Sequence, residues 1–359
     1  MEIHTILCTF CVSLVGAYTI IKYPSVFVAE GGRHVTAKQS AWRFEAPRSG
    51  GIAIMLSVSF ASFITENQTA IIILMSALPL LLAGLVEDTT KYEISPKYRL
   101  LIAALCSAIA SAWFGVTIDR VDIAYVDLLL QIAAVGFLFT MFAVAGFTHA
   151  LNLVDGLNGF SSFIAITIMV AFGYLAFQYG YADLLAVNIF VAVAFLGFMV
   201  FNFPKGRIFL GDVGAYCFGF VIAWNAVLFL HREPDISAWA ILSNLFWPVA
   251  DTLWAMLRRL LNNMPVGKPD QLHFHSVMQR TLIIWSRNRM NLERANPIAS
   301  LILWPAVVVP VLMSVLLVEQ KQGSLIAAIT MALLFVLSYS FVIRTTTKNR
   351  QFGKHRPTV

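Results

Sequence analysis

The feature that most constrains this chain is a series of apolar stretches, most of them close to the length that crosses a lipid bilayer. About 20 apolar residues in a helix span the hydrocarbon core, and we count eleven candidate stretches in the 359 residues. Only 12% of the residues are charged, against about 25% in soluble domains. We therefore predict an all-α polytopic membrane protein. The predicted spans are 3–21, 50–64, 71–86, 100–116, 128–148, 160–179, 184–201, 213–230, 238–257, 298–318 and 324–343.

Lysine and arginine are distributed unevenly between the loops that these spans define. Loops on one side, together with the C-terminal tail, hold 22 of the 25 Lys and Arg residues, and the positive-inside rule makes that side cytoplasmic. We expect the N-terminus outside, one transmembrane domain over 1–343 and a basic cytoplasmic tail over 344–359. The acids of the outer loops, such as Asp122 and Asp183, are expected only to be solvated. The cytoplasmic loops are then 22–49, 87–99, 149–159, 202–212 and 258–297.

The first cytoplasmic loop ends in a pattern that suits a phosphate group. Arg48 precedes Gly50 and Gly51, which lead directly into a predicted span. Free N–H groups at a helix start, together with the helix dipole, favour an anion. A plain turn at the membrane entry would have the same sequence, so we treat phosphate binding here as a hypothesis.

The second cytoplasmic loop begins with two adjacent acids, Glu87 and Asp88. The C-terminal end of a helix favours cations, and neighbouring carboxylates repel each other. A divalent cation or a cationic partner would offset both effects, so Asp88 in particular is a candidate functional residue. Lys97, further along the loop, is a candidate phosphate ligand or a simple topological charge.

The third and fourth cytoplasmic loops offer oxygen ligands and an aromatic ring. Asn152, Asp155 and Asn158 recur every third residue, so they share one face of a helical turn. Carboxylate and amide oxygens suit magnesium, and an amide edge can read a nucleobase. Asp212 is a further oxygen ligand, and Phe209 is either a stacking platform for a base or an interfacial anchor.

The long segment 258–297 carries His273, His275 and Arg280. Two histidines at i and i+2 do not share a helix face, so we expect an extended or irregular segment that donates to phosphate or sugar groups. Too few ligands are present for a zinc site. Asp251, an acid within a predicted span, is a functional candidate or the partner of Arg258.

As a set, these motifs resemble the polyprenyl-phosphate N-acetylhexosamine-1-phosphate transferase family, which includes phospho-N-acetylmuramoyl-pentapeptide transferase and enzymes that start O-antigen, teichoic acid and N-glycan lipid carriers. The resemblance covers about residues 22 to 281. It rests on Pro47–Gly51, Glu87–Asp88, Asn152–Gly159, Phe209–Gly214, Pro248–Thr252 and the histidine segment.

The resemblance implies transfer of a sugar-1-phosphate from a UDP-sugar to undecaprenyl phosphate, with release of UMP and with Mg²⁺, or alternatively Mn²⁺, as cofactor. It implies an inner-membrane enzyme that starts a cell-surface glycan, and no nucleic-acid partner. A homodimer is left open. Carried over by position, Asp88, Asp155 and Asp212 are catalytic; Asp212, Asn152 and Asp88 hold the metal; and Arg48, Lys97, Asn158, Phe209, His273, His275 and Arg280 bind substrate.

Three positions depart from the family pattern. Glu87 stands where an Asp is usual, Asn158 stands where bacterial members have an Asp, and the histidine cluster reads His-Phe-His-Ser. The last departure bears on sugar identity more than on the type of reaction. An inactive binding homologue and a multi-helix transporter are the alternatives, although transporter sites lie near the bilayer midplane and these acids lie in loops.

Overall fold

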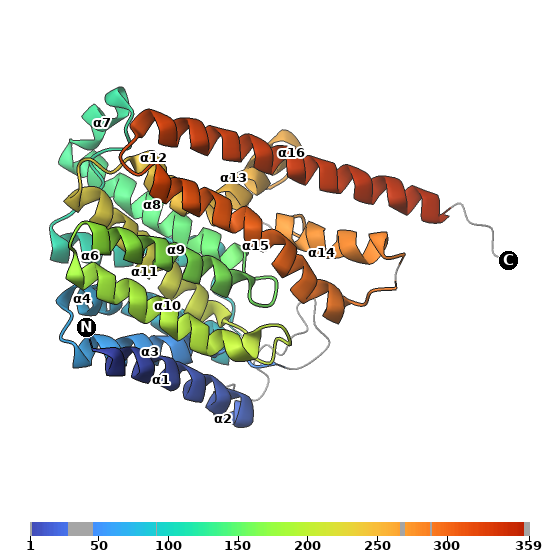
Figure 1. The fold of residues 1–359 in the computed structure, drawn as a ribbon, viewed down its shortest axis with the longest axis horizontal. Coiled ribbons are helices and arrows are strands. Elements are labelled where there is room, and N and C mark those ends of the chain that lie inside the picture. The colour runs from blue at the N-terminus through green and yellow to red at the C-terminus, as the bar shows by residue number, and fades with distance from the viewer. Residues whose placement is uncertain (1, 28–45, 91, 266–269, 288, 355–359) are drawn as a thin grey trace.

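The computed structural model describes residues 2–27, 46–90, 92–265, 270–287 and 289–354, and every regular element among them is an α-helix (Figure 1). Most of loop 22–49 and the end of the basic tail lie outside these residues. The helices are α1 (Ile3–Lys22), α2 (Pro24–Phe27), α3 (Gly50–Ile64), α4 (Gln68–Ser76), α5 (Leu78–Thr89), α6 (Pro96–Phe114), α7 (Ala124–Leu130), α8 (Ala133–Leu153), α9 (Phe160–Gln178), α10 (Ala182–Asn202), α11 (Gly211–Arg232), α12 (Ala238–Asn244), α13 (Phe246–Leu261), α14 (Phe274–Trp285), α15 (Leu292–Leu316) and α16 (Lys321–Lys354).

The number of spans that the structure supports is lower than the eleven we predicted. By length and apolar composition, eight helices of the described chain can cross a membrane, or ten if each of two bent pairs counts as one span. The pairs are α4 with α5, bent by 51°, and α12 with α13, bent by 85°. Helix α3 fills the predicted stretch 50–64 but has only 15 residues, fewer than a helix normally needs to cross the hydrocarbon core. A polytopic membrane protein is confirmed, whereas the eleven spans and their orientation are not.

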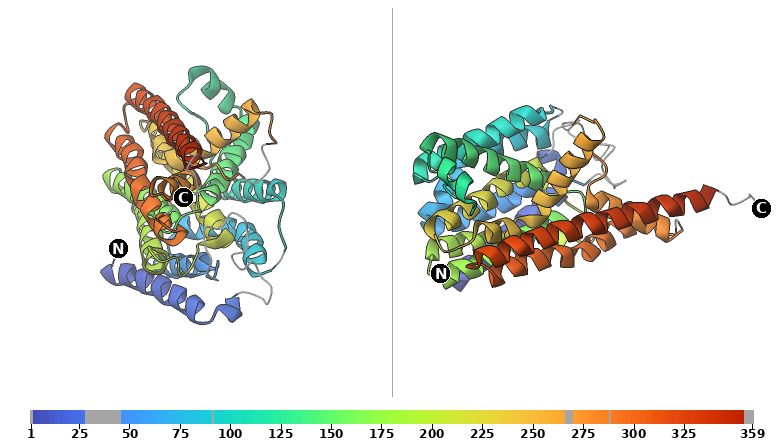
Figure 2. Two further views of the ribbon diagram at one scale, coloured as in Figure 1. Left: turned by 90° about the vertical axis from the view of Figure 1, so that its right-hand side faces the viewer. Right: turned by 90° about the horizontal axis from the view of Figure 1, so that it is seen from above.

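Helix α11 forms the centre of the bundle. Its membrane-spanning window is wholly buried, and α3, α5, α8 and α9 all contact it. A helix that is apolar on every side is buried inside a larger assembly, and nearly every residue from Val213 to Leu230 is apolar or small. Helices α1 and α16 lie at the outside of the bundle, and α16 extends well past its end (Figure 2).

The loops predicted to be cytoplasmic gather at one end of the bundle, on the right in Figure 1, where α14 and the end of α16 also lie. At the opposite end, the acids do more than we expected. Arg232 pairs with Asp183 at 2.8 Å, and both Arg120 and Lys321 lie 3.2 Å from Asp122. The three basic residues of that side are therefore used to pair these acids and tie the short loops together.

Close packing between the start of α3 and the start of α11 depends on glycine. A Cβ atom on Gly51 would lie 2.1 Å from the Gly214 nitrogen, and one on Gly50 would lie 2.2 Å from the Phe198 ring. The start of α3 therefore touches the first turn of α11 backbone to backbone, which places the loops that precede these two helices side by side.

We expect Gly51→Ala to lower the melting temperature of the detergent-solubilised protein, because the added methyl group forces α3 away from α11. Overpacking of this kind costs about 1–3 kcal/mol. The matched control is Gly146→Ala in α8, where a Cβ would meet nothing within 4 Å and alanine is the better helix former. Equal melting temperatures for the two variants would contradict this account.

Candidate functional site

The loops that carry Pro47 and Phe209, the first and fourth of those predicted to be cytoplasmic, are held together by backbone hydrogen bonds. Phe209 N–H donates to Pro47 O at 2.9 Å, Gly50 N–H to Phe209 O at 2.9 Å, and Gly51 N–H to Leu210 O at 2.8 Å. The expectation that Gly50 and Gly51 offer free N–H groups to a phosphate is therefore wrong. These glycines are needed for close approach, and their donors are already used.

Asp88 binds the N-terminus of the central helix. Its two carboxylate oxygens accept hydrogen bonds from Asp212 N–H and Val213 N–H, both at 2.9 Å, and the residue is only 5% exposed. The first N–H groups of a helix have no partner within the helix, so this carboxylate satisfies two of them from another helix. Gly211, with φ +75°, supplies the left-handed turn into α11, and a Cβ there would lie 1.7 Å from Arg48 O.

Asp212 contacts Asn152, and these are two of the residues that the family resemblance names as metal ligands. Asn152 Nδ2 donates to Asp212 Oδ1 at 3.0 Å, which joins the end of α8 to the start of α11. Asp155 lies in the turn after α8 and accepts a hydrogen bond from Ser161 Oγ at 2.5 Å. Burial raises the pKa of Asp155, while the hydrogen bond from Ser161 and the nearby charge of Arg48 oppose that rise. Three of the predicted polar residues are thus brought to one place.

Asn158 has a different setting from Asn152 and Asp155. Its side chain is fully buried, its Nδ2 donates to Pro204 O at 2.7 Å, and its backbone N–H donates to Asn296 Oδ1 at 2.8 Å. Asn202 Oδ1 in turn accepts from Gly159 N–H at 2.6 Å. Asn158 therefore ties three segments together, and its predicted contact with uracil stays a prediction.

The histidine segment begins a helix rather than remaining irregular. His273 is the residue before α14, and His275 lies in the first turn of that helix. Asp251 pairs with His273, at 3.0 Å between Oδ2 and Nδ1. It does not pair with Arg258, which forms an ion pair with Asp270 instead. The histidine rings stack with centroids 5.7 Å apart.

His275 lies against the third loop. A Cβ on Gly156 would be 2.3 Å from His275 Nε2, so only a glycine leaves room for the imidazole. The long segment 258–297 thereby reaches the turn that holds Asp155. Two predicted substrate ligands are less constrained, because Lys97 and Arg280 are exposed. Phe209 is partly buried in the loop before α11.

Sequence reasoning missed a buried polar column next to Asp212. Arg99 forms an ion pair with Glu87 at 2.5 Å, and its guanidinium lies over the Tyr216 ring, 5.8 Å from the centroid. Tyr216 also stacks on His149, with centroids 6.2 Å apart. His149 and Tyr216 sit one helical turn from Asn152 and Asp212, so spacing could have revealed this pair. The ion pair also explains how the chain accommodates Glu87.

The residues present suit a magnesium ion that substrate phosphates complete. No group of three or more His, Cys, Asp or Glu side chains suited to a metal gathers in the described part of the chain. Mg²⁺ is usually held by one or two carboxylates plus phosphate oxygens. Asp212 supplies a carboxylate, and since Asn152 donates through its nitrogen, its amide oxygen is the atom left for the ion. Asp88 fits less well, because both of its oxygens already accept N–H groups.

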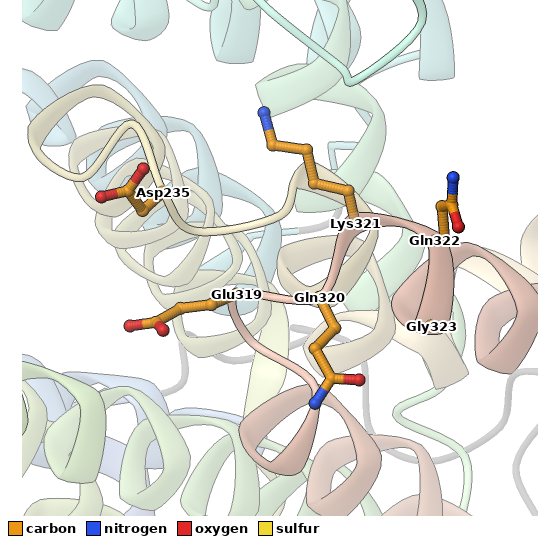
Figure 3. Close-up of a pocket in the computed structure, with 6 residues that line it drawn as sticks. All are labelled: Asp235, Glu319, Gln320, Lys321, Gln322 and Gly323. Atoms are coloured by element: carbon orange, nitrogen blue, oxygen red, sulfur yellow. The ribbon is translucent and has the colours of Figure 1, made fainter.

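A shallow pocket at the opposite end of the bundle does not share this chemistry. It is lined by residues that include Asp235, Glu319 and Lys321. Figure 3 shows these side chains directed apart rather than toward a common centre. The candidate site is therefore at the other end of the bundle, where Asp88, Asn152 and Asp212 lie.

Removal of Asp88 should destabilise the fold more than neutralisation of Asp212 does. We expect Asp88→Ala to cost about 0.5–2 kcal/mol, as the loss of a helix cap does, because two N–H groups of α11 lose their acceptor. Asp212→Asn should leave the melting temperature nearly unchanged, since an amide can keep the contact with Asn152. Thermal melts in detergent test this, and equal losses in the two variants would show that Asp88 is not a cap.

The protein should lose stability in mild acid because of His275. Burial lowers its pKa below the ordinary value of 6.5, aided by the charges of His273 and Arg280 and opposed by Asp251. As pH falls through 6.5 toward the folded value, the unfolded chain takes up the proton first, so the folded state is disfavoured. The melting temperature of wild type should then fall more steeply below pH 6.5 than that of His275→Asn. Parallel curves would contradict the burial of a neutral imidazole.

Comparison with known proteins gives a consistent match. The profile of glycosyl transferase family 4 matches residues 70–230. A Bacillus subtilis (strain 168) protein named "Probable undecaprenyl-phosphate N-acetylglucosaminyl 1-phosphate transferase" is 29% identical over 64% of each chain. A Yersinia pestis undecaprenyl-phosphate alpha-N-acetylglucosaminyl 1-phosphate transferase is 26% identical, over 65% of this chain and 66% of its own. A Streptococcus pneumoniae (strain CGSP14) phospho-N-acetylmuramoyl-pentapeptide-transferase is also 26% identical, over 63% and 72%.

The match spans just under two thirds of the length of the first two relatives. It includes the loops of Asp88, Asn152 and Asp212, which the structure joins through hydrogen bonds. Over residues 70–230, with this arrangement and these relatives, the chain is similar to glycosyl transferase family 4.

Proposed function

We propose that this protein transfers a sugar-1-phosphate, of the N-acetylhexosamine type, from a UDP-sugar to undecaprenyl phosphate and releases UMP. The observation that carries the proposal is the Asp212–Asn152 pair, fixed at the start of the buried central helix by Asp88. It lies at one end of an apolar bundle, where the ends of α5 and α8 meet the start of α11. A charged donor and a lipid-linked acceptor meet at such a membrane boundary.

The reaction we propose is a direct displacement. An oxygen of the lipid phosphate attacks the sugar-linked phosphorus, a new P–O bond forms, and the bond from that phosphorus to the bridging oxygen breaks, so that UMP leaves. Bound magnesium would neutralise the diphosphate and stabilise the charge on the leaving UMP. Asp212 and Asn152 are the residues we propose to hold it, and Arg48 is a nearby cation for phosphate oxygens.

The environment of Asp88 favours an orienting role over a covalent one. Both oxygens accept backbone N–H groups, which reduces the nucleophilicity of the carboxylate and fixes its direction. A phosphate monoester has its second pKa at about 6, so the lipid phosphate is mostly dianionic near neutral pH and needs little help from a base. Exchange of labelled UMP into UDP-sugar without lipid acceptor would instead support a covalent Asp88 intermediate.

The position of the acids also bears on the alternative of a transporter. Asp88, Asp155 and Asp212 lie at the ends of helices or in a turn at one end of the bundle, whereas transporter sites lie near the midplane. We propose that this end faces the cytoplasm of a bacterial inner membrane, where UDP-sugars are made. The product would start a cell-surface glycan such as O-antigen, capsule or exopolysaccharide.

The test is UMP release by purified protein with magnesium, undecaprenyl phosphate and a panel of UDP-N-acetylhexosamines. We expect UMP only when both lipid and metal are present, and a loss of about 100-fold or more in Asp212→Asn, because charge in the transition state loses its stabilisation. The donor that gives the highest rate identifies the sugar.

Asp235→Asn is the matched control, since it neutralises a carboxylate at the opposite end of the bundle and should leave the rate unchanged. Absence of UMP with every donor, from folded protein and beside an active control enzyme, would favour a binding or transport role.

A further inference from the structure

Asp251 uses both carboxylate oxygens on the histidine segment. Oδ2 lies 3.0 Å from His273 Nδ1 and 3.8 Å from His275 Nδ1, and Oδ1 accepts Phe274 N–H at 2.9 Å. All three side chains named in these contacts, those of Asp251, His273 and His275, are at most 5% exposed. Asp251, a buried acid on α13, therefore contacts both the first turn of α14 and the imidazole ring of His273, the residue before that helix.

A carboxylate accepts hydrogen bonds and cannot donate them, so its partner nitrogen must carry the proton. Which nitrogen of a histidine is protonated is set by the bond that the other nitrogen makes. We propose that Asp251 is a positioning residue that fixes His273 with its proton on Nδ1, and so presents Nε2 as the ring atom for recognition of the donor sugar.

Further contacts from α13 and α16 hold the backbone of the histidine segment in place. Tyr339 Oη, on α16, donates to Leu272 O at 2.8 Å, and Arg258 Nη1 donates to the same oxygen at 3.0 Å. Phe274 packs between Trp247 and Phe335, with ring centroids 5.6 and 5.3 Å away. The backbone around His273 is thus held from α13 and α16 together, so the ring cannot turn without breaking the Asp251 contact.

The place of the segment indicates the class of group that Nε2 would meet. His275 stacks on His273 and touches Gly156, beside the turn of Asp155. An unprotonated Nε2 accepts a hydrogen bond, and an N-acetylhexosamine offers hydroxyl and amide donors. This assignment rests on the proposed function, because the sugar is supplied by the donor of that reaction.

A purely structural role for Asp251 predicts a different outcome, and Asp251→Asn separates the two. The amide oxygen can still accept Phe274 N–H, so the helix cap is kept. The amide nitrogen can only donate, which forces Nδ1 of His273 to accept and moves the proton to Nε2. Asp251→Ala removes both the cap and the orienting bond.

The first measurement is the ¹⁵N spectrum of histidine-labelled protein, with the His273 signals assigned from His273→Asn. At mildly alkaline pH we expect a protonated Nδ1 in wild type and a protonated Nε2 in Asp251→Asn. An unprotonated Nδ1 in wild type would overturn the proposal. This arm does not use catalysis, so it decides the orientation of the ring even if no donor sugar is turned over.

The second measurement is the UMP-release assay. Asp251→Asn should keep the wild-type melting temperature but lower kcat/KM about 10- to 100-fold, chiefly by raising KM for the UDP-sugar, because the sugar loses an acceptor. Asp251→Glu should recover part of the loss. Tyr339→Phe, which removes the hydrogen bonds of Tyr339 Oη to Leu272 O and Arg258 Nη1 but leaves Asp251 in place, should lower the melting temperature and leave the tautomer of His273 unchanged. Wild-type KM in Asp251→Asn, with the proton moved to Nε2, would show that His273 does not read the sugar.

Discussion

The structure depends on hydrogen-bond partners for the N–H groups at the start of α11. This helix is buried along its membrane-spanning length, and the N–H groups of its first turn have no partners within the helix. Asp88, a residue of α5, accepts hydrogen bonds from two of these N–H groups. Loss of such a cap costs about 0.5–2 kcal/mol. The same contact brings the loop that follows α5 to Asp212, so the bond that completes the helix also assembles the candidate site.

Part of the site could be predicted from the sequence. Asn152, in the last turn of α8, and Asp155, in the turn after it, both reach the region of Asp212. Asn158, the third residue of that spacing, lies past the end of the helix and contacts Pro204 and Asn296 instead. The apolar stretches likewise predicted where helices run. The pattern gave no means to separate a crossing helix from a bent pair, because the break between α12 and α13 lies inside one continuous apolar stretch.

The sequence could not reveal which hydrogen-bond or ion-pair partner each polar group has in the structure. Gly50 and Gly51 suit an anion site in sequence, yet their N–H groups donate to Phe209 and Leu210. The pairing of Asp251 with His273 rather than Arg258 depends on where α14 begins. Arg99 is the partner of Glu87 in the structure, although they lie twelve residues apart in the sequence. Each of these assignments requires the relative placement of separate helices, which periodicity does not contain.

The bracing of the histidine segment by α16 has a consequence for chimeric proteins. Tyr339 and Phe335 lie over 60 residues beyond the segment they contact, on the last helix. A graft of residues 270–285 from another protein would have to fit the surface that Tyr339 and Phe335 form here, unless the matching part of its own last helix were transferred with it. In this fold, the histidine segment and the part of α16 that contacts it have to be exchanged together.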